Sequence, residues 1–280
     1  FMLPEEYGGG GFTDVFSQCL AQEELCAGDP GIGNLVASNG FFAHPVMELG
    51  NDEQKQRWLT PLATAETPMT SLAVTEPGVG SDSAAMATRA TKVDGGYRIS
   101  GQKTWISNGG AAEFYVVFAK TDPEGGSRGI SAFIVDATTP GLDDSAHIPV
   151  MAPHPLATLT FARCRVSGEQ MLGEVNGGFK LAMQRLDIFR ASVAAAALGM
   201  ARRALAEAIH HAQHRKMFGQ TLADFQLTQA KLGEMAALID AGALLTYRAA
   251  WMRDTGQGSQ KERSVAAAMA KMTAPENAQR

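Results

Sequence analysis

The stretch LAVTEPGVGSDSA, residues 72–84, leaves a strand-like segment and enters a glycine-rich turn. Gly78 and Gly80 have no Cβ, so a ligand can approach the backbone N–H groups of this turn closely, as in the concave turns that bind phosphate. Ser81 adds a hydroxyl donor. A plain β-turn is the simpler alternative, because glycine and serine are also the usual residues of turns.

A second polar segment, GQKTWISNGG at residues 101–110, ends another strand-like run. Trp105 and Ser107 are two residues apart, and strand alternation predicts that their side chains lie on the same face. A flat aromatic ring beside a hydroxyl group suits a planar heteroaromatic cofactor. Taken alone, Trp105 would more often be a core residue.

A third segment, HRKMFGQTLADFQLTQ at residues 214–229, lies between two helical patterns. Arg215 precedes Phe218, and Gln226 begins the next helix. Arginine suits a phosphate group, and glutamine suits a nucleotide edge or a pyrophosphate. A solvated arginine and a polar contact between helices are the simpler alternative.

Around these segments, the sequence predicts an α+β multidomain fold. Residues 1–70 form a partial N-terminal helical domain, in which Thr13 or Asp14 is expected to cap one helix and Asn51 another, and Asp29-Pro30-Gly31 to break one. Residues 71–170 carry short strands without intervening helices, including a hairpin at Asp94-Gly95-Gly96, which predicts an antiparallel β-barrel. Residues 171–280 form a partial C-terminal four-helix bundle. Its first helix carries an apolar stripe of Leu186, Phe189, Val193, Leu198, Leu205 and Ile209.

Composition limits the classes of function. The chain of 280 residues is 45% hydrophobic and carries a net charge of −5, so a nucleic-acid-binding or anionic-membrane surface is not indicated. None of its apolar runs approaches the roughly 20 residues of a membrane span. Cys19 and Cys26 are predicted to be core thiols on one helix face, and three cysteines favour a reducing compartment. We expect a cytoplasmic protein, or a mitochondrial matrix protein if the source is eukaryotic. Both ends of the chain are expected to be cut.

The chain resembles the acyl-CoA dehydrogenase family. The resemblance covers nearly the whole chain in family order, which makes it specific. It rests on LPEEYGGGG, NDEQKQRWLTPLATAE, AVTEPGVGSD, GQKTWISNGG, GGFKLAMQRLD, RKMFGQTLADFQ and KMTAPENAQR. It implies a flavoprotein oxidoreductase that removes a proton and a hydride from an acyl-CoA thioester and passes electrons to an electron-transferring flavoprotein. The implied assembly is a homo-oligomer, either a dimer or a tetramer.

The resemblance also implies roles for individual residues. The cofactor, FAD, would be wrapped by the segment Leu72–Ser81, with Thr75 at the pyrimidine edge and Ser107 at the flavin N5 side beside Trp105. Ser81, Asp187 and Arg190 match positions that contact the acyl-CoA. A further segment would reach the FAD of a neighbouring subunit. The full set of implied FAD contacts is Leu72, Val74, Thr75, Gly80, Ser81, Trp105, Ile106, Ser107, Arg215, Met217, Phe218, Phe225 and Gln226.

The chain departs from the family pattern in three places. The usual catalytic base is a glutamate expected beyond Arg280, and the alternative base position holds Phe189, which cannot abstract a proton. Val79 replaces a usual alanine. The segment VMAPHPLATLTF departs from the family's Lys-Met-Gly-x-Arg-x-Ser stretch. Within it, His154 is interpreted as part of a barrel connection rather than as a substrate contact.

Two other functions remain open from the sequence. One is a flavin-dependent oxidase or monooxygenase on the same fold, and the other is a non-catalytic flavin- or acyl-binding homologue. His210 and His214 have the spacing of a metal-binding pair on a helix, but no third ligand is evident and no metal site is expected. Acyl chain length and branching are not readable from the sequence.

Overall fold

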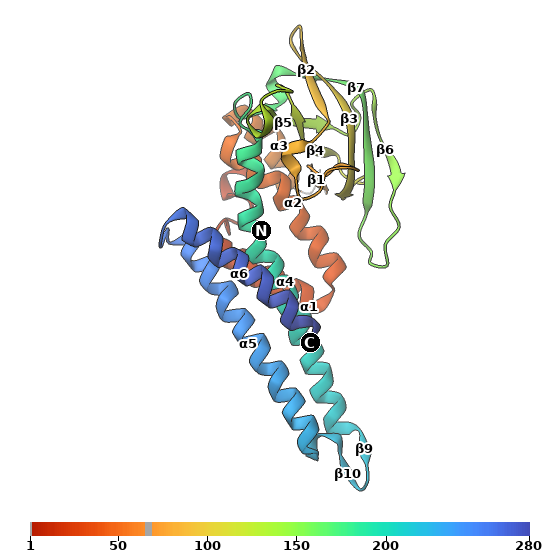
Figure 1. Cartoon of the computed structure of the whole chain (residues 1–280), viewed down its shortest axis with the longest axis vertical. Helices are drawn as coiled ribbons and strands as arrows, with labels where there is room; N and C mark the ends of the chain where they lie inside the picture. The colour runs from red at the N-terminus through yellow and green to blue at the C-terminus, as the bar shows by residue number, and fades with distance from the viewer. Residues whose placement is uncertain (1, 65–68) are drawn as a thin grey trace. The chain divides into compact units, whose positions relative to one another are not determined.

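The computed structural model describes residues 2–64 and 69–280, with the backbone alone for residues 184, 185 and 187. The chain forms two compact units. One consists of residues 1–12 and 35–185, and the other of residues 13–34 and 186–280. Figure 1 shows the strands of the sheet in the first unit and the long helices of the second. The two units are described separately below.

Two of the N-terminal helices begin after predicted caps, Asp14 and Asn51, and the first helix ends at the predicted break beside Asp29. They are preceded by a 3₁₀ turn, Glu5–Tyr7. Helix α1 is Val15–Gly28, and its N-cap Asp14 accepts a hydrogen bond from the Ser17 N–H. Helix α2, Pro30–Leu49, begins at a proline, which has no N–H to leave unsatisfied in the first turn. Helix α3, Asp52–Ala63, has the capping box of Asn51 and Gln54.

The first unit contains an eight-stranded, mostly antiparallel sheet in the order β6-β7-β3-β2-β4-β5-β8, with β1 parallel to β4. This confirms the predicted antiparallel β region, and β2 and β3 form the predicted hairpin. The strands are β1 Thr70–Ala73, β2 Arg89–Val93, β3 Gly96–Ser107, β4 Phe114–Lys120, β5 Ile130–Asp136, β6 Leu142–His147, β7 Leu156–Ser167 and β8 Met171–Leu172. Short 3₁₀ turns occur at Ser83–Ala85, Gly126–Gly129 and Gly168–Gln170.

Both faces of the central strands are buried. Alternation along β4 places Val116 and Phe118 in a core shared with α2 and α3. Tyr115 and Val117 point the other way, into a core that includes residues of β3 and β7. The sheet therefore lies between two hydrophobic clusters. The packing of the second cluster holds β3 and β7 in place, and with them the ends of the loops that leave these strands.

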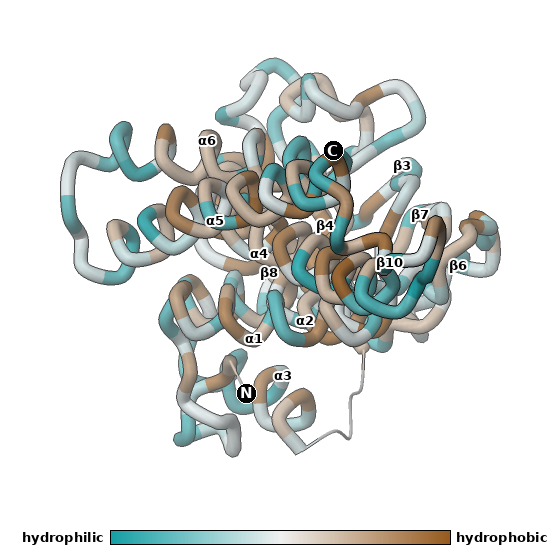
Figure 2. Tube along the Cα trace, turned by 90° about the horizontal axis from the view of Figure 1, so that it is seen from below, coloured by the Kyte–Doolittle hydropathy of each residue, from teal (hydrophilic) through white to brown (hydrophobic). Residues whose placement is uncertain are grey.

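The second unit is helical. It contains α1, most of α4 (Gly178–His214), α5 (Gln226–Asp254) and α6 (Gln260–Gln279), with a small hairpin of β9 (Lys216–Met217) and β10 (Gln220–Thr221) and a 3₁₀ turn, Leu222–Asp224. Figure 2 shows hydrophobic and hydrophilic residues interspersed along α5 and α6. None of the described helices combines the length and the hydropathy that a membrane span requires.

Most of the buried core residues on α4, α5 and α6 are alanines rather than the large residues of the predicted stripe. Leu198 is buried as predicted, but Leu186, Val193 and Ile209 are exposed. The prediction of the stripe is therefore wrong at these three positions, because alanines on α4, α5 and α6 let the helices approach closely and carry the core instead. The buried alanines are Ala194, Ala201, Ala243, Ala249, Ala266, Ala267, Ala270 and Ala274.

Candidate functional site

A bulge in β3 shapes the predicted Trp105 segment. The pairing of β3 with β7 shifts register between Lys103 and Ile106, and Trp105 adopts a left-handed φ of 56°. The Trp105 side chain is 59% exposed, whereas Ile106 is only 2% exposed and packs into the sheet core. Ser107 is half-buried. Ile106 can therefore offer a ligand only its backbone, whereas Trp105 and Ser107 can offer their side chains.

The glycine-rich turn is closed by two backbone hydrogen bonds. The Glu76 N–H donates to the Val79 carbonyl and the Val79 N–H donates to the Glu76 carbonyl, each at 3.0 Å. Gly80 and Ser81 are exposed, and a Cβ added at Gly78 or Gly80 would meet no atom within 4 Å. The space beside the turn is open, so a ligand can reach this backbone.

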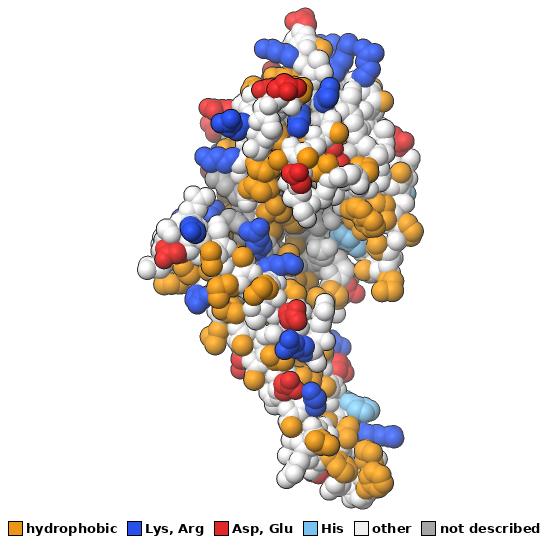
Figure 3. Space-filling model, viewed as in Figure 1, with side chains coloured by type: hydrophobic (Ala, Val, Ile, Leu, Met, Phe, Trp, Pro, Cys, Tyr) orange, Lys and Arg blue, Asp and Glu red, His pale blue; other side chains and the backbone are white. Residues whose placement is uncertain are grey.

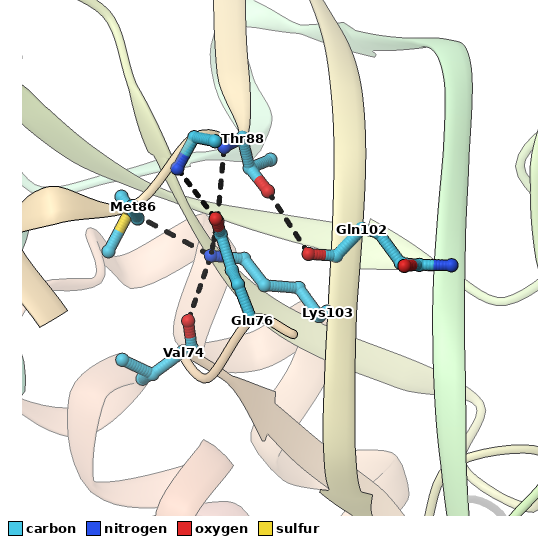
Figure 4. Close-up of polar contacts among 7 residues, drawn as sticks. Val74, Glu76, Met86, Thr88, Gln102 and Lys103 are labelled. Carbon is cyan, nitrogen blue, oxygen red and sulfur yellow. Dashed lines mark hydrogen bonds and ion pairs between the residues drawn. The ribbon is translucent and has the colours of Figure 1, made fainter. Parts of the chain in front are cut away.

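A buried ion pair joins the glycine-rich turn to β3. Figure 4 shows the Lys103 amine between the Glu76 carboxylate, the Val74 carbonyl and the Met86 sulfur. Its Nζ lies 2.8 Å from Glu76 Oε1, 2.9 Å from the Val74 oxygen and 3.8 Å from Met86 Sδ. All three donors of the ammonium are therefore taken. The Glu76 carboxylate also accepts the backbone N–H groups of Ala87 at 2.6 Å and Thr88 at 3.0 Å.

The pair is almost fully closed to water, and both of its groups are shifted. Burial lowers the pKa of Lys103 to about 8, against the raising effect of Glu76. Burial alone would raise the pKa of Glu76, but the Lys103 charge and the hydrogen bonds from Lys103, Thr88 and Ala87 outweigh it and lower that pKa. The pair is therefore charged near neutral pH, and each partner depends on the other to remain so.

Two further hydrogen bonds connect the same segments. The Thr104 N–H donates to the Thr75 carbonyl at 2.9 Å, and the Ser71 hydroxyl donates to the Ser107 carbonyl. Together with the ion pair, they hold the two segments that carry the predicted residues of the first unit against each other. These residues are Leu72, Val74, Thr75, Gly80, Ser81, Trp105, Ile106 and Ser107.

The remaining predicted FAD contacts lie at the hairpin end of the second unit. Met217 pairs with Gln220, and Phe218 and Gly219 form the connecting turn with φ values of 54° and 82°. The Phe218 side chain is 89% exposed. Figure 3 shows hydrophobic side chains gathered at this end of the unit. Arg215 and Gln226 are also exposed, and Phe225 is half-buried.

The predicted substrate contacts on α4 are only partly described. Arg190 is half-buried, and the side chain of Asp187 lies outside the described residues. Phe189 is 7% exposed.

Sequence reasoning missed the residues that hold the site together. Glu76 and Lys103 are 27 residues apart, and the sequence around neither residue predicts that they form an ion pair. His154 lies in the connection between β6 and β7, and its Nε2 is 3.0 Å from Ser107 Oγ, a contact that the sequence does not predict. Its position between two prolines was the only signal available. Asn108, at φ 60°, has a buried side-chain oxygen without a hydrogen-bond partner.

The residues of the first unit fit a flavin nucleotide. Trp105 offers a flat apolar face, Thr75 and Ser107 offer hydroxyl groups, and the open backbone of Gly78 and Gly80 offers access for a phosphate group. The aromatic face and the hydrogen-bonding edge groups suit the isoalloxazine ring of FAD, and the accessible glycine-rich backbone suits its pyrophosphate.

The described residues do not gather into a metal site. Among them, no group of three or more His, Cys, Asp and Glu residues could hold an ion. His210 and His214 have ring centroids 4.3 Å apart, and His214 Nδ1 lies 2.7 Å from the His210 carbonyl oxygen. That contact engages one ring nitrogen of His214 with its own helix.

Three family models match the chain in order. They describe the acyl-CoA dehydrogenase N-terminal domain over residues 1–66, the middle domain over residues 71–164 and the C-terminal domain over residues 176–280. The short-chain specific acyl-CoA dehydrogenase of Megasphaera elsdenii is 41% identical over 99% of this chain and 72% of its own length. The chain spans between 61% and 72% of the length of several curated relatives.

Solved structures agree with these matches. Butyryl-CoA dehydrogenase from Megasphaera elsdenii has a TM-score of 0.92 and 38% identity, over 99% of this chain and 72% of that one. A chain in a structure of the electron transferring flavoprotein of Acidaminococcus fermentans has a TM-score of 0.93 and 40% identity, over the same shares. The predicted fold and family are confirmed: the chain belongs to the acyl-CoA dehydrogenase family.

Proposed function

We propose that the full-length protein is an FAD-dependent oxidoreductase that forms the α,β double bond of a short-chain acyl-CoA thioester. One observation of the structure carries this proposal. The β3 bulge presents the exposed Trp105 and the half-buried Ser107 beside the open turn at Gly78 and Gly80. Relatives named for short-chain acyl-CoA and butyryl-CoA support the short-chain class.

In this proposal, FAD supplies the acceptor for the hydride that leaves the β-carbon of the thioester. Trp105 would lie beside the flavin, and the Ser107 hydroxyl would hydrogen-bond its edge. Thr75 would hydrogen-bond the pyrimidine edge, while the backbone at Gly80 and the Ser81 hydroxyl would hold the pyrophosphate. Such groups orient the reacting atoms and stabilise charge, and the cofactor carries the redox chemistry.

Ser81, Asp187 and Arg190 are proposed to hold the CoA portion of the substrate. An arginine suits a phosphate because its planar guanidinium can form two hydrogen bonds to it. The catalytic base remains a prediction from the family resemblance, which places a glutamate beyond Arg280. Phe189 has no group that can accept a proton.

The second unit is proposed to complete the site of a neighbouring subunit through the β9–β10 hairpin. The support is exposure, because Phe218 is 89% and Leu227 is 85% accessible at this end of the unit. Large exposed apolar side chains in one place indicate an interaction surface. We propose a homo-oligomer, either a dimer or a tetramer, with an electron-transferring flavoprotein as the electron acceptor.

Turnover with a defined substrate tests the proposed function. The full-length protein is supplied with butyryl-CoA and either an artificial electron-accepting dye or dissolved oxygen alone. Butyryl-CoA-dependent dye reduction with little oxygen consumption is the expected result. Rapid oxygen consumption without added dye would identify an oxidase. Flavin-containing protein that is inert with both acceptors, over acyl chains of four to sixteen carbons, would identify a non-catalytic homologue.

A further inference from the structure

We propose that His154 is a positioning residue that fixes the hydroxyl of Ser107 at the flavin edge. The inference rests on the proposed function, because it concerns the same cofactor site. It deepens that function by assigning a role to the connection between β6 and β7.

The contact is direct and lies within the first unit. The imidazole Nε2 of His154 is 3.0 Å from Ser107 Oγ, a normal hydrogen-bond distance. The backbone of Ser107 is held separately, because its carbonyl accepts the hydroxyl of Ser71. The Ser71 contact fixes where the residue sits, and the His154 contact restricts the rotation of its hydroxyl.

His154 is itself held firmly. Pro153 and Pro155 restrict the backbone on both sides, because the proline ring fixes φ. The His154 N–H donates to the Ala152 carbonyl at 2.8 Å, and the Asn108 N–H donates to the Pro155 carbonyl at 2.8 Å. The second bond attaches the segment to the residue that follows Ser107. The two prolines and the two hydrogen bonds together hold the His154 imidazole beside Ser107.

The chemistry of the pair explains what the contact does. A serine hydroxyl has one donor hydrogen and two acceptor lone pairs. Burial lowers the pKa of His154, which favours the neutral ring with one donor and one acceptor nitrogen. When Nε2–H donates to Ser107 Oγ, the serine hydrogen is left to point outward as a donor. When Nε2 accepts that hydrogen, a serine lone pair is left for a ligand donor. The tautomer of His154 therefore decides whether the Ser107 hydroxyl donates a hydrogen bond to the ligand or accepts one from it.

The segment also borders an open depression of about 410 Å³. Its lining includes His147, Val150 and His154. His147 is exposed on β6 and provides a matched control, because it is a histidine beside the same depression and is not the residue bonded to Ser107.

A double-mutant cycle tests the inference in the full-length protein. The apo forms of wild type, His154→Leu, Ser107→Ala and the double variant are titrated with FAD, and the flavin absorption spectrum of each holo form is recorded. Losing one neutral hydrogen bond is worth about 0.5–1.5 kcal/mol, so His154→Leu should weaken FAD binding about two- to tenfold and displace the flavin absorption band. In the Ser107→Ala background, His154→Leu should have no further effect. His154→Gln, which keeps a polar group, should recover most of the affinity, and His147→Leu should match wild type.

The outcomes separate this inference from the function on which it rests. Wild-type protein without FAD, which also fails to take up added FAD, would overturn both. Wild-type protein with FAD, but with His154→Leu unchanged in affinity and spectrum, would overturn the role of His154 alone. An equal loss of affinity on His154→Leu in the wild-type and Ser107→Ala backgrounds would show a packing role and would also overturn it.

Discussion

Two buried glutamates, one in each unit, are paired in different ways. Glu76 meets Lys103, and the two side chains are 4% and 0% exposed. Glu23 meets Arg202, whose side chain is 44% exposed, while the Glu23 side chain is 8% exposed. Glu23 also accepts the hydroxyl of Tyr247, and burial raises the pKa of that tyrosine.

The difference shows which pair supports a site. Glu76 and Lys103 lie on the two segments that carry the candidate flavin contacts, and their charges depend on each other because water is excluded. Glu23 and Arg202 join α1 to α4, where water reaches the arginine and tyrosine offers a second partner. Breaking the first pair should therefore disturb both stability and cofactor binding, whereas breaking the second should cost stability only modestly.

The largest expected effect is that of Lys103→Met. Removing one partner of a buried pair leaves an uncompensated charge on Glu76, which costs about 3–5 kcal/mol. The free energy of unfolding, measured by urea denaturation of the full-length protein, should fall by that amount. Lys92→Met is the control, because Lys92 is an exposed lysine of the same sheet and should change stability by about 0.5 kcal/mol or less. Equal losses in the two variants would refute the importance of burial.

Adding Glu76→Gln to Lys103→Met should recover part of the loss. The double variant removes the stranded charge, and replacement of a whole buried pair by neutral groups is often tolerated. Its free energy of unfolding should exceed that of Lys103→Met by about 1–3 kcal/mol, the cost of an unsatisfied buried polar group. A double variant less stable than Lys103→Met would show that Glu76 does not rely on this partner.

Arg202→Met should lower the free energy of unfolding by about 1 kcal/mol or less. Water screens an arginine that is 44% exposed, and Tyr247 still donates to Glu23. Arg203→Met is a matched control, because Arg203 forms an exposed pair with Glu207 on the same helix. If Arg202→Met lowered the free energy of unfolding as much as Lys103→Met does, the proposed difference between the two glutamate pairs would be wrong.

Trp105→Gly should separate stability from binding. The φ of 56° favours glycine over other residues by about 1 kcal/mol, and an exposed tryptophan has little burial to lose. The free energy of unfolding of the apo protein should therefore rise slightly or stay the same, while FAD binding weakens. Trp251→Ala, at an exposed tryptophan of α5, should leave FAD affinity unchanged. Unaltered FAD binding by Trp105→Gly would exclude Trp105 from the flavin site.

The smallest effect concerns acid pH. The folded-state pKa of Glu76 lies below its ordinary value of 4.5, so the folded protein binds this proton less tightly than the unfolded chain does. Its contribution to stability is present above about pH 4.5 and is lost as the pH falls through the folded-state pKa. Unfolding free energies between about pH 6 and pH 3 should thus decline less steeply for Glu76→Gln than for wild type. Parallel curves would contradict this.

The sequence could predict what local patterns encode. Asp14 and Asn51 cap helices, Asp29-Pro30-Gly31 separates two helices, and Asp94-Gly95-Gly96 forms a hairpin turn, because each acts over a few residues. The Trp105 bulge and the Glu76–Lys103 pair depend on contacts between strands, which no local window contains. The predicted apolar stripe on α4 is wrong at Leu186, Val193 and Ile209, which are exposed. Packing of small residues, rather than hydrophobic periodicity, selects the buried face of this helix.

The most direct measurement of the contrast is FAD affinity in three proteins: wild type, Glu76→Gln and Arg202→Met, each full-length, stripped of cofactor and titrated with FAD. Glu76→Gln weakens hydrogen bonds to a charged group, worth about 1.5–3 kcal/mol, that hold the glycine-rich turn in place, so FAD binding should weaken by up to about a hundredfold. Arg202→Met should remain within about twofold of wild type, which is a difference of about 0.4 kcal/mol. Unchanged affinity in Glu76→Gln, or an equal loss in both variants, would contradict the claim that the buried pair of the first unit organises the flavin site.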